Sequence, residues 1–342
     1  MASSFHKTPI HGALLLPLLF ACGATCTAGG RGGAAGREKL PALVAATLPA
    51  VVKVRPAGRM AQDGGSGFFV AGRDGRPVVV TNHHVIWGAS ELAIETNDGT
   101  VEAAEVAGVD PETDLAILRL TSNASTPKVL AFGGDEALSL GDSVVAVGSP
   151  GGVSNAVSLG IVSARGLVPR GTVAAQRFIE HLFIDAAVAA GSSGGPVLGM
   201  DGRVVGVTTG VVGGTSLGIV APDRLVANVV DRLQRDGAIR HSWSGLRVTE
   251  DPGSGHDGAV KVTAVASVQA EPPLRVGDVI VRLDGSRLRG SRDFQWREFS
   301  DEPGRTWRLN VVRGSEQIVV SLTLQPLTQA VFARQASGPP SL

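Results

Sequence analysis

Gly191-Ser192-Ser193-Gly194-Gly195-Pro196 places a serine between glycines, so that the backbone can fold tightly and direct two N–H groups to one point. Such a pair of donors stabilises the negative charge that develops on a carbonyl oxygen and forms an oxyanion hole. We expect Gly191 and Ser193 to supply these N–H groups while the Ser193 hydroxyl attacks the carbonyl carbon. Taken alone, the stretch is more often a flexible turn, so the other catalytic groups must be found elsewhere.

A serine nucleophile needs a base, and the base needs an acid that orients it. The apolar run 77–80 predicts a buried strand, and the histidine pair His83-His84 follows at its end. Asp114 stands thirty residues after His84 (84 to 114), immediately before another strand-like run. Ser193 follows after a further 79 residues (114 to 193). The order His, Asp, Ser is the chymotrypsin-type order, which fits two β-barrels with the site at their junction.

The residues alone leave alternatives for two members of this triad. Either His83 or His84 can be the base, and a histidine at a strand end can also be an ordinary structural residue. Asp110 competes with Asp114 as the acid, but it lies before Pro111 in a turn signature, where aspartate usually bonds its own backbone. Asp114 is therefore the better placed acid.

Seven short motifs, in this order along the chain, resemble the HtrA (high-temperature-requirement A) family of trypsin-like serine proteases. The motifs lie at 49–54, 65–70, 81–85, 113–116, 141–150, 185–187 and 191–196, and the resemblance as a whole covers roughly residues 40–326. The family pattern Thr-Asn-x-His-Val falls on His84 and leaves His83 as a neighbour. The resemblance implies an endopeptidase that cleaves unfolded or misfolded cell-envelope proteins through an acyl-enzyme, with no cofactor and no metal.

The pocket for the substrate residue before the scissile bond (P1) can be placed by the same resemblance. In trypsin-like folds its floor lies six positions before the nucleophile, at Ala187, where no carboxylate is present to bind Arg or Lys. We expect the strand after the nucleophile to supply the walls at Thr208, Thr209 and Val211. A small or medium aliphatic P1 residue is therefore expected.

Departures from the family pattern bear on two features. Ala189 and Ala190 stand where the family commonly has Asn-Pro, and Ser192 replaces Asn, which leaves open whether the oxyanion hole is formed at rest. The family also implies a homotrimer built through the N-terminal part of the protease domain. The segment 40–54 contains no aromatic residue for the stacking contact that such trimers often use.

The sequence after the protease motifs predicts a helix and then a second domain. Pro222-Asp223 offers a helix start, apolar residues recur at helical spacing, and Gly237 is a plausible stop. Residues 241–326, with a helix expected at 292–299, resemble a PDZ domain, and a generic small β domain is the alternative. In a PDZ domain the loop at Ser244, Gly245 and Leu246 would bind the C-terminal carboxylate of a peptide.

The N-terminus has the features of a targeting segment. Lys7 precedes the apolar run 13–21, which is too short to span a bilayer and predicts a signal peptide. The run ends before Cys22 in a sequence that resembles a bacterial lipobox, which implies lipidation of Cys22 and a membrane tether; cleavage of an ordinary signal peptide is the alternative. The expected organisation is a signal peptide at 1–21, a flexible tether at 22–39, a protease domain at 40–238, a PDZ-like domain at 241–326 and a tail at 327–342.

Composition agrees with an extracytoplasmic soluble protein, and the two resemblances imply the bacterial cell envelope, either periplasmic or lipid-anchored. The 342 residues carry a formal net charge of zero, so no basic field is available to bind nucleic acid. The only cysteines, Cys22 and Cys26, precede the predicted domains, so no disulfide can cross-link them. The 46 glycines between short apolar runs favour antiparallel strands. The sequence thus predicts a mainly β protein, a chymotrypsin/trypsin-like double β-barrel followed by a small PDZ-like α+β domain.

Two other functions are compatible with some of the same residues. A catalytically idle protease fold could bind unfolded chains or C-terminal peptides as a chaperone or adaptor, but all three residue types of the triad are present. An esterase could use the same triad, and Gly191, Ser193 and Gly195 fit its Gly-x-Ser-x-Gly pattern. The strand-to-helix context and the triad order of the esterase fold are both missing, which favours the protease.

Overall fold

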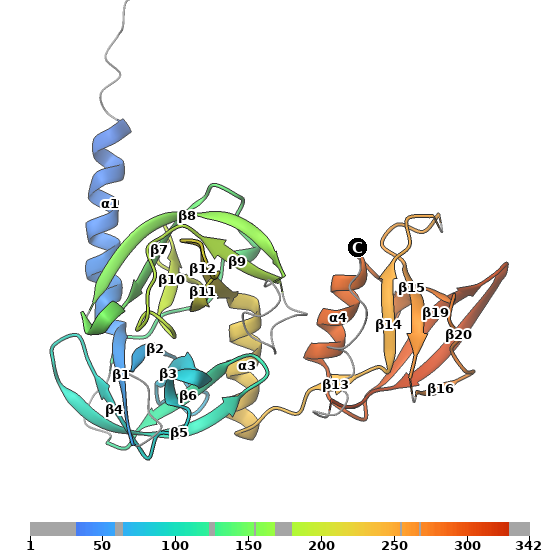
Figure 1. Cartoon of the computed structure of the whole chain (residues 1–342), viewed down its shortest axis with the longest axis horizontal. Helices are drawn as coiled ribbons and strands as arrows, with labels where there is room; N and C mark the ends of the chain where they lie inside the picture. The colour runs from blue at the N-terminus through green and yellow to red at the C-terminus, as the bar shows by residue number, and fades with distance from the viewer. Residues whose placement is uncertain are drawn as a thin grey trace, which may run out of the picture. The chain divides into compact units, whose positions relative to one another are not determined.

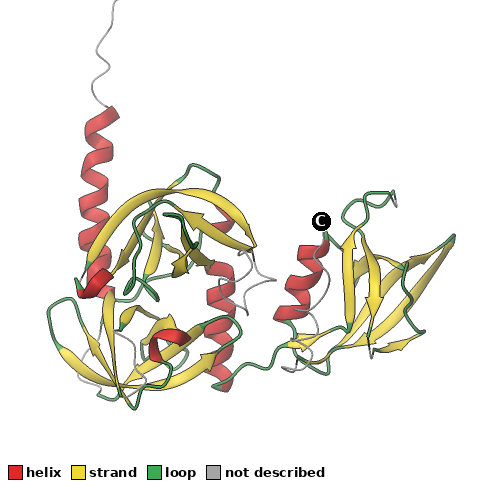
Figure 2. Ribbon diagram, viewed as in Figure 1, coloured by secondary structure: helices red, strands yellow, loops and turns green. Residues whose placement is uncertain are grey.

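The computed structural model describes residues 32–58, 64–122, 127–153, 155–167, 180–253, 255–266 and 268–327. Strands dominate these residues and helices are few (Figure 2), which confirms the predicted mainly β class. In the described part of the chain, no helix is both long enough and apolar enough to cross a membrane. Cys22 and the segments 1–21 and 328–342 lie outside the described residues.

The first six strands form a closed antiparallel barrel in the order β1-β2-β3-β6-β5-β4 (blue to cyan in Figure 1). Branched and aromatic side chains, among them Val54, Phe69 and Ile94, fill its interior and are buried. The short helix α2 (His83–Ile86) follows directly on the third strand. The strands are β1 (Val51–Ala57), β2 (Gly65–Val70), β3 (Val78–Asn82), β4 (Glu91–Glu95), β5 (Val101–Asp110) and β6 (Leu115–Leu120).

The next six strands close a second antiparallel barrel in the order β10-β11-β12-β9-β8-β7. Short helices η2 (Asp135–Ala137) and η3 (Pro150–Gly152) lie before and after its first strand. The strands are β7 (Ser143–Gly148), β8 (Ala156–Leu167), β9 (Glu180–Ile184), β10 (Pro196–Gly199), β11 (Val204–Val211) and β12 (Gly218–Pro222). Together the two barrels confirm the double-barrel prediction.

Helix α3 (Asp223–Asp236) ends the protease part as predicted. Gly237 stops it with a φ of 72° and donates its N–H to the Leu233 carbonyl at 2.8 Å, because glycine adopts this left-handed conformation without a steric penalty. The apolar face of α3 packs in a core cluster that also contains Leu115 of the first barrel and Val145 of the second. The helix therefore stabilises the junction of the two barrels.

The segment that precedes the first barrel is helical over part of the expected tether. Helix α1 (Gly32–Thr47) begins inside the stretch 22–39, and η1 (Leu48–Ala50) leads from it into β1. The residues from Ala34 to Lys39 include several strong helix formers, so the segment can be helical although it lacks core-forming residues. Leu40 and Leu43 then pack against the core cluster that contains α3.

The C-terminal part is a second, smaller β domain. Its main sheet has the order β14-β15-β17-β19-β20-β16, with β18 on β17 and a separate β13–β21 pair. Helix α4 (Ser291–Ser300) covers the predicted range 292–299, and its Phe294 packs edge-on against Trp307 at 5.4 Å. The strands are β13 (Ser242–Trp243), β14 (Leu246–Glu250), β15 (Val260–Val265), β16 (Gln269–Glu271), β17 (Val279–Leu283), β18 (Ser286–Arg287), β19 (Thr306–Arg313), β20 (Glu316–Thr323) and β21 (Gln325–Pro326).

Candidate active site

His84 and Asp114 form a short side-chain contact at the end of two paired strands. Strand β3 ends beside the start of β6, with Asn82 opposite Leu115, so the residues that follow and precede these strands meet. The His84 Nδ1 atom lies 2.6 Å from Asp114 Oδ2, and the His84 backbone N–H donates to Asp114 Oδ1 at 2.8 Å. The carboxylate is buried while the imidazole is about one-third exposed, which leaves one edge of the ring open to a substrate.

The backbone around Asp114 is fixed in an unusual conformation. Asp114 has a φ of 57°, in the left-handed region that few residues other than glycine adopt. Its carbonyl oxygen accepts two hydrogen bonds, from the Asn82 side chain at 2.8 Å and from the His83 backbone N–H at 3.0 Å. These contacts hold the carboxylate toward His84. They also give Asn82 and His83 positioning roles at this site.

The turn at Gly191–Pro196 requires glycine at two positions. Gly191 has a φ of 94°, and a Cβ atom there would lie 2.4 Å from the Ser149 carbonyl oxygen. Gly194 has a φ of 84°, and a Cβ atom there would lie 2.2 Å from the Ser66 carbonyl oxygen. Both distances are far below van der Waals contact, so any side chain would displace the Ser193 backbone between them.

Ser66 ties this turn to the first barrel, and the sequence analysis assigned it no role. Its hydroxyl donates to the Gly191 carbonyl oxygen at 2.7 Å and accepts from the Ser149 N–H at 2.8 Å. Its backbone N–H donates to the Ser193 carbonyl oxygen at 2.8 Å. The only signal in the sequence was its place in the motif at 65–70. Ser66 thus fixes the orientation of the Gly191 carbonyl.

The N–H groups expected to form the oxyanion hole remain available. Neither Gly191 nor Ser193 donates its backbone N–H to an acceptor among the described residues. The neighbouring amides of the turn are occupied, since the Ser192 N–H donates to the Ala189 carbonyl and the Gly194 N–H to the Thr208 carbonyl. Among the described residues, the two N–H groups predicted to form the oxyanion hole are thus the ones without an acceptor in this part of the turn.

His84, Gly191 and Ser193 line one cavity of about 620 Å³. Lys53 adds a cationic side chain to the lining, and its Nζ lies 3.4 Å from the Gly152 carbonyl oxygen. The rest of the lining is uncharged and comprises Gly64, Gly65, Val85, Ser149, Gly151, Gly152 and Ala190. The fold thus brings the predicted base, the predicted nucleophile and both residues predicted to donate to the oxyanion to the same cleft.

A second, smaller cavity of about 160 Å³ adjoins the same turn through Ser192. It contains Ala187 and Thr208 of the predicted P1 pocket, and all of its lining residues are uncharged. Thr209 does not line this cavity, and its hydroxyl lies 3.4 Å from the Ile219 carbonyl oxygen. Val211 lies further along β11, outside this lining. The structure therefore brings together two of the four predicted pocket residues.

Asp110, the competing acid, has a different partner. Its two carboxylate oxygens lie 2.9 and 3.0 Å from His241 Nε2, and both side chains are almost fully buried. The Thr113 hydroxyl donates to the same carboxylate at 2.7 Å, and the His241 ring stacks on Phe299 at 4.3 Å. Asp110 thus anchors the start of the C-terminal domain beside the turn that carries Asp114.

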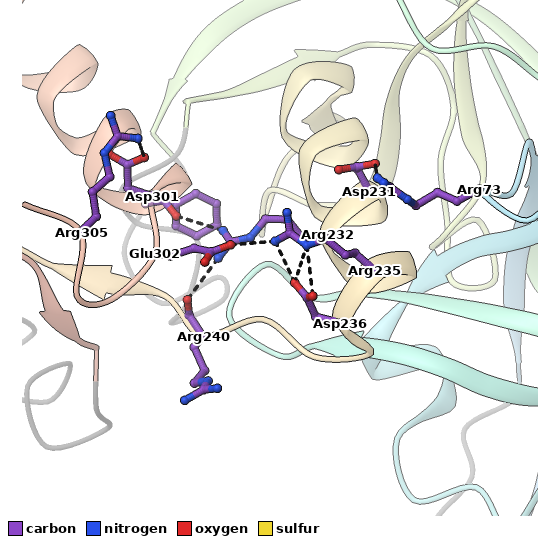
Figure 3. A network of polar contacts seen from close by, with 10 residues as sticks. Arg73, Asp231, Arg232, Arg235, Asp236, Arg240, Asp301, Glu302 and Arg305 are labelled. Atoms are coloured by element: carbon purple, nitrogen blue, oxygen red, sulfur yellow. Dashed lines mark hydrogen bonds and ion pairs between the residues drawn. The ribbon is translucent and has the colours of Figure 1, made fainter. Parts of the chain in front are cut away.

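Arginines of α3 add polar contacts to the same region (Figure 3). Arg232 donates to the carbonyl oxygens of Phe299, at 3.4 Å, and Arg240, at 3.1 Å. Arg235 forms an ion pair with Glu302 at 2.7 Å. These contacts hold the chain on either side of His241 in sequence, at Arg240 and at the end of α4, against α3.

We expect His241→Ala to destabilise the protein by about 3 to 5 kcal/mol, because it leaves the Asp110 carboxylate buried without its main partner. Urea unfolding followed by tryptophan fluorescence would measure the loss. The double variant Asp110→Ala/His241→Ala should lose less than the sum of the single variants, because no unpaired carboxylate remains. Additive losses would show that the contact contributes no coupling energy.

The loop at Ser244, Gly245 and Leu246 has an internal partner. The Ser244 N–H donates to the Glu298 carboxylate at 2.6 Å, and the Leu246 N–H donates to the Ser244 hydroxyl at 3.2 Å. Burial raises the pKa of Glu298 to about 7. One of the three amides expected to bind a peptide carboxylate is therefore already occupied by a carboxylate of the chain itself.

Comparison with known proteins identifies both halves of the chain. A family described as trypsin-like peptidase domain matches residues 65–207, and the PDZ domain family matches residues 245–324. A probable periplasmic serine endoprotease, DegP-like, of Rhizobium meliloti (strain 1021) is 34% identical over 276 residues, covering 77% of this chain and 53% of that relative. The protein of the same description from Brucella suis biovar 1 is 35% identical over 289 residues, covering 80% of this chain and 55% of its own length. The chain thus spans about half the length of the curated relatives it matches.

Solved structures agree on the fold. The HtrA-type protease AlgW with a tripeptide matches with a TM-score of 0.71 at 24% identity, covering 84% of this chain and 96% of that chain. The serine endoprotease from Yersinia pestis matches with a TM-score of 0.62 at 26% identity, covering 84% of this chain and 97% of that chain.

Two closed barrels with a paired histidine and aspartate at the cleft define a trypsin-like serine protease domain. A PDZ domain follows it, so the alternative of a generic small β domain is set aside. The chain belongs to the HtrA family, as its motifs predicted.

Proposed function

We propose that the protein is a serine endopeptidase of HtrA type that cleaves unfolded or misfolded proteins of the bacterial envelope. The observation that supports this most is the His84–Asp114 contact of 2.6 Å at the cleft that Ser193 also lines. In the proposed roles His84 is the general base and then the general acid, Asp114 orients it, and Ser193 is the nucleophile.

The contact at Nδ1 determines which nitrogen of His84 can react. Because Asp114 accepts a hydrogen bond from Nδ1–H, the lone pair of the neutral ring lies on Nε2. In acylation, Nε2 takes the Ser193 hydroxyl proton as Oγ bonds to the substrate carbonyl carbon, and the Gly191 and Ser193 N–H groups stabilise the oxyanion. The proton then passes to the leaving amine as the C–N bond breaks. In deacylation water repeats the sequence and releases Ser193.

The two cavities beside the nucleophile suggest how a substrate chain lies in the cleft. We assign the P1 side chain to the 160 Å³ cavity with Ala187 and Thr208, because its uncharged lining and small size suit a small or medium aliphatic residue. The leaving part of the substrate would then occupy the larger cavity beside His84 and Lys53. A substrate that places side chains in both cavities would have to lie across the Gly191–Pro196 turn, which a segment of an unfolded chain can do.

We expect Ala187→Asp to shift the P1 preference from aliphatic residues toward Arg and Lys, because it adds a carboxylate to an uncharged pocket. A peptide library cleaved by both proteins would measure the ratio of kcat/KM values for basic and aliphatic P1 residues, and about tenfold is expected. Ala187→Asn is the matched control, since it adds a similar volume without the charge. A wild-type preference for basic P1 residues would refute the pocket assignment.

Casein incubated with the purified protein, beside its Ser193→Ala variant, tests the proposed function. Cleavage by the wild type alone supports the endopeptidase. Capture of casein by both proteins without cleavage would support the alternative, a catalytically idle protease fold that binds unfolded chains or C-terminal peptides.

The proposal also covers the cellular location and the oligomeric state of the enzyme. Relatives are named periplasmic, which favours the bacterial cell envelope for this chain also. Lipidation of Cys22 would tether it to a membrane, and the family resemblance favours a homotrimer. The described residues contain no cluster of three potential metal ligands, and the mechanism above uses neither a metal nor another cofactor.

A further inference from the structure

A groove of about 300 Å³ lies between α4 and β14 of the PDZ domain. Leu246 and Val248 of β14 and Phe294 of α4 give it an apolar lining. Strand β14 stands at one end of the sheet order, so its outer edge has no strand partner among the described residues (Figure 1). An extended peptide can pair with such an edge, and its last side chain then enters the apolar space.

Glu298 occupies the end of this groove where a peptide carboxylate would arrive. Its Oε1 atom lies 2.6 Å from the Ser244 backbone nitrogen, and its carbonyl oxygen accepts a hydrogen bond from the Ser242 hydroxyl. Ser244 has no exposed surface, so a ligand can reach its N–H only after the Glu298 side chain has moved. The Gly245 N–H, by contrast, has no acceptor among the described residues.

The carboxyl group of Glu298 changes protonation state close to neutral pH. Burial raises its pKa to about 7, and the hydrogen bonds from Ser244 lower the pKa only in part. A folded-state pKa above the usual value means that the proton is bound below about pH 7 and is lost as the pH rises through it.

Other charged groups surround α4. Three of them, Arg297, His241 and Arg232, have partners of their own. Arg297 on the helix binds Asp293 at 3.0 Å. His241, which stacks on Phe299, binds Asp110, and Arg232 donates to backbone carbonyls. Arg247 of β14 lines the groove itself. When ionised, Glu298 therefore places a negative charge in the groove that an incoming carboxylate would enter.

We propose that Glu298 is an internal competitor in the PDZ groove, so that a peptide with an apolar last residue and a free C-terminal carboxylate binds only when Glu298 is displaced or protonated. Binding is then coupled to proton uptake, and the groove takes its ligand more readily in an acidified envelope. This inference goes beyond the proposed proteolytic function and does not depend on it.

Fluorescence anisotropy with short labelled peptides that end in Ala, Val, Leu or Phe tests the proposal. The full chain carries Ser193→Ala so that no peptide is cleaved. The Kd of the peptides that bind should rise about tenfold between pH 6 and pH 8, as expected for one competing group with a pKa near 7. The same peptides with amidated C-termini should bind weakly at both pH values.

Two substitutions of Glu298 separate the effect of its negative charge from the effect of its hydrogen bond to the Ser244 N–H. Glu298→Gln keeps an oxygen that can accept from Ser244 but has no charge, so its Kd should equal that of the parent at pH 6 and stay constant with pH. Glu298→Ala removes the competitor and should bind most tightly at every pH. Thermal unfolding would show that both variants are folded.

Three results would overturn the proposal. Retention of the pH dependence in Glu298→Gln would assign it to another group such as His241. Weaker binding by Glu298→Ala would show that Glu298 supports the loop and does not compete. Failure of every peptide to bind any of the three proteins would show that the groove is not a carboxylate site.

Discussion

Ser193→Ala is expected to lower the rate of casein cleavage by about 10⁴- to 10⁶-fold, because the substitution removes the only atom that bonds to the substrate carbonyl carbon. The backbone N–H groups of Gly191 and Ser193 remain, so binding and oxyanion stabilisation should persist and account for the residual rate. Gel assays over seconds for the wild type and over several days for the variant would cover most of this range.

Ser192→Ala is the matched control, since it removes a hydroxyl from the neighbouring residue of the same turn. The Ser192 hydroxyl accepts one long hydrogen bond, from the Ala189 N–H at 3.2 Å, so we expect at most a modest loss of activity. Thermal unfolding should give similar Tm values for both variants and the wild type. Cleavage by Ser193→Ala at a near wild-type rate would refute the mechanism, whereas equal losses in both variants would indicate a disturbed turn.

Much of the fold was predictable because it depends on local patterns. Short apolar runs between glycine turns predicted antiparallel strands, and the order His, Asp, Ser predicted two barrels. The helix stop at Gly237 has a conformation that glycine adopts readily. The tether prediction at 22–39 was wrong for the residues from Gly32 onward, which are helical. Absence of core-forming residues indicates that a segment does not build a core, but it does not prevent helix formation.

The contacts within the site were predictable only where a motif marked them. Ser66 bonds across 125 residues to the Gly191 carbonyl, and His241 bonds across 131 residues to Asp110. Neither pairing follows from a periodicity or a short spacing, because each depends on how separate elements pack. The Glu298 contact with Ser244 is likewise a product of tertiary packing. Sequence patterns therefore located the loop expected to bind a peptide carboxylate. They could not show that the Ser244 amide already donates to the carboxylate of Glu298.

His84→Ala is expected to reduce casein cleavage about as strongly as Ser193→Ala, whereas His83→Ala should retain most of the activity. The reason lies in their contacts with Asp114. His84 presents its ring to the carboxylate at 2.6 Å, while His83 uses only its backbone N–H, which alanine keeps. Comparison of kcat/KM for a single peptide substrate would measure both losses.

The pair of variants also distinguishes the base from a structural histidine. Losing a base lowers kcat with little change in KM, because the imidazole takes its proton from Ser193 only as the oxyanion forms. Losing a structural contact would instead lower the Tm and affect both constants. If His83→Ala were the inactive variant, the carboxylate of Asp114 would have to orient a residue whose side chain it does not contact, and the proposed triad would fail.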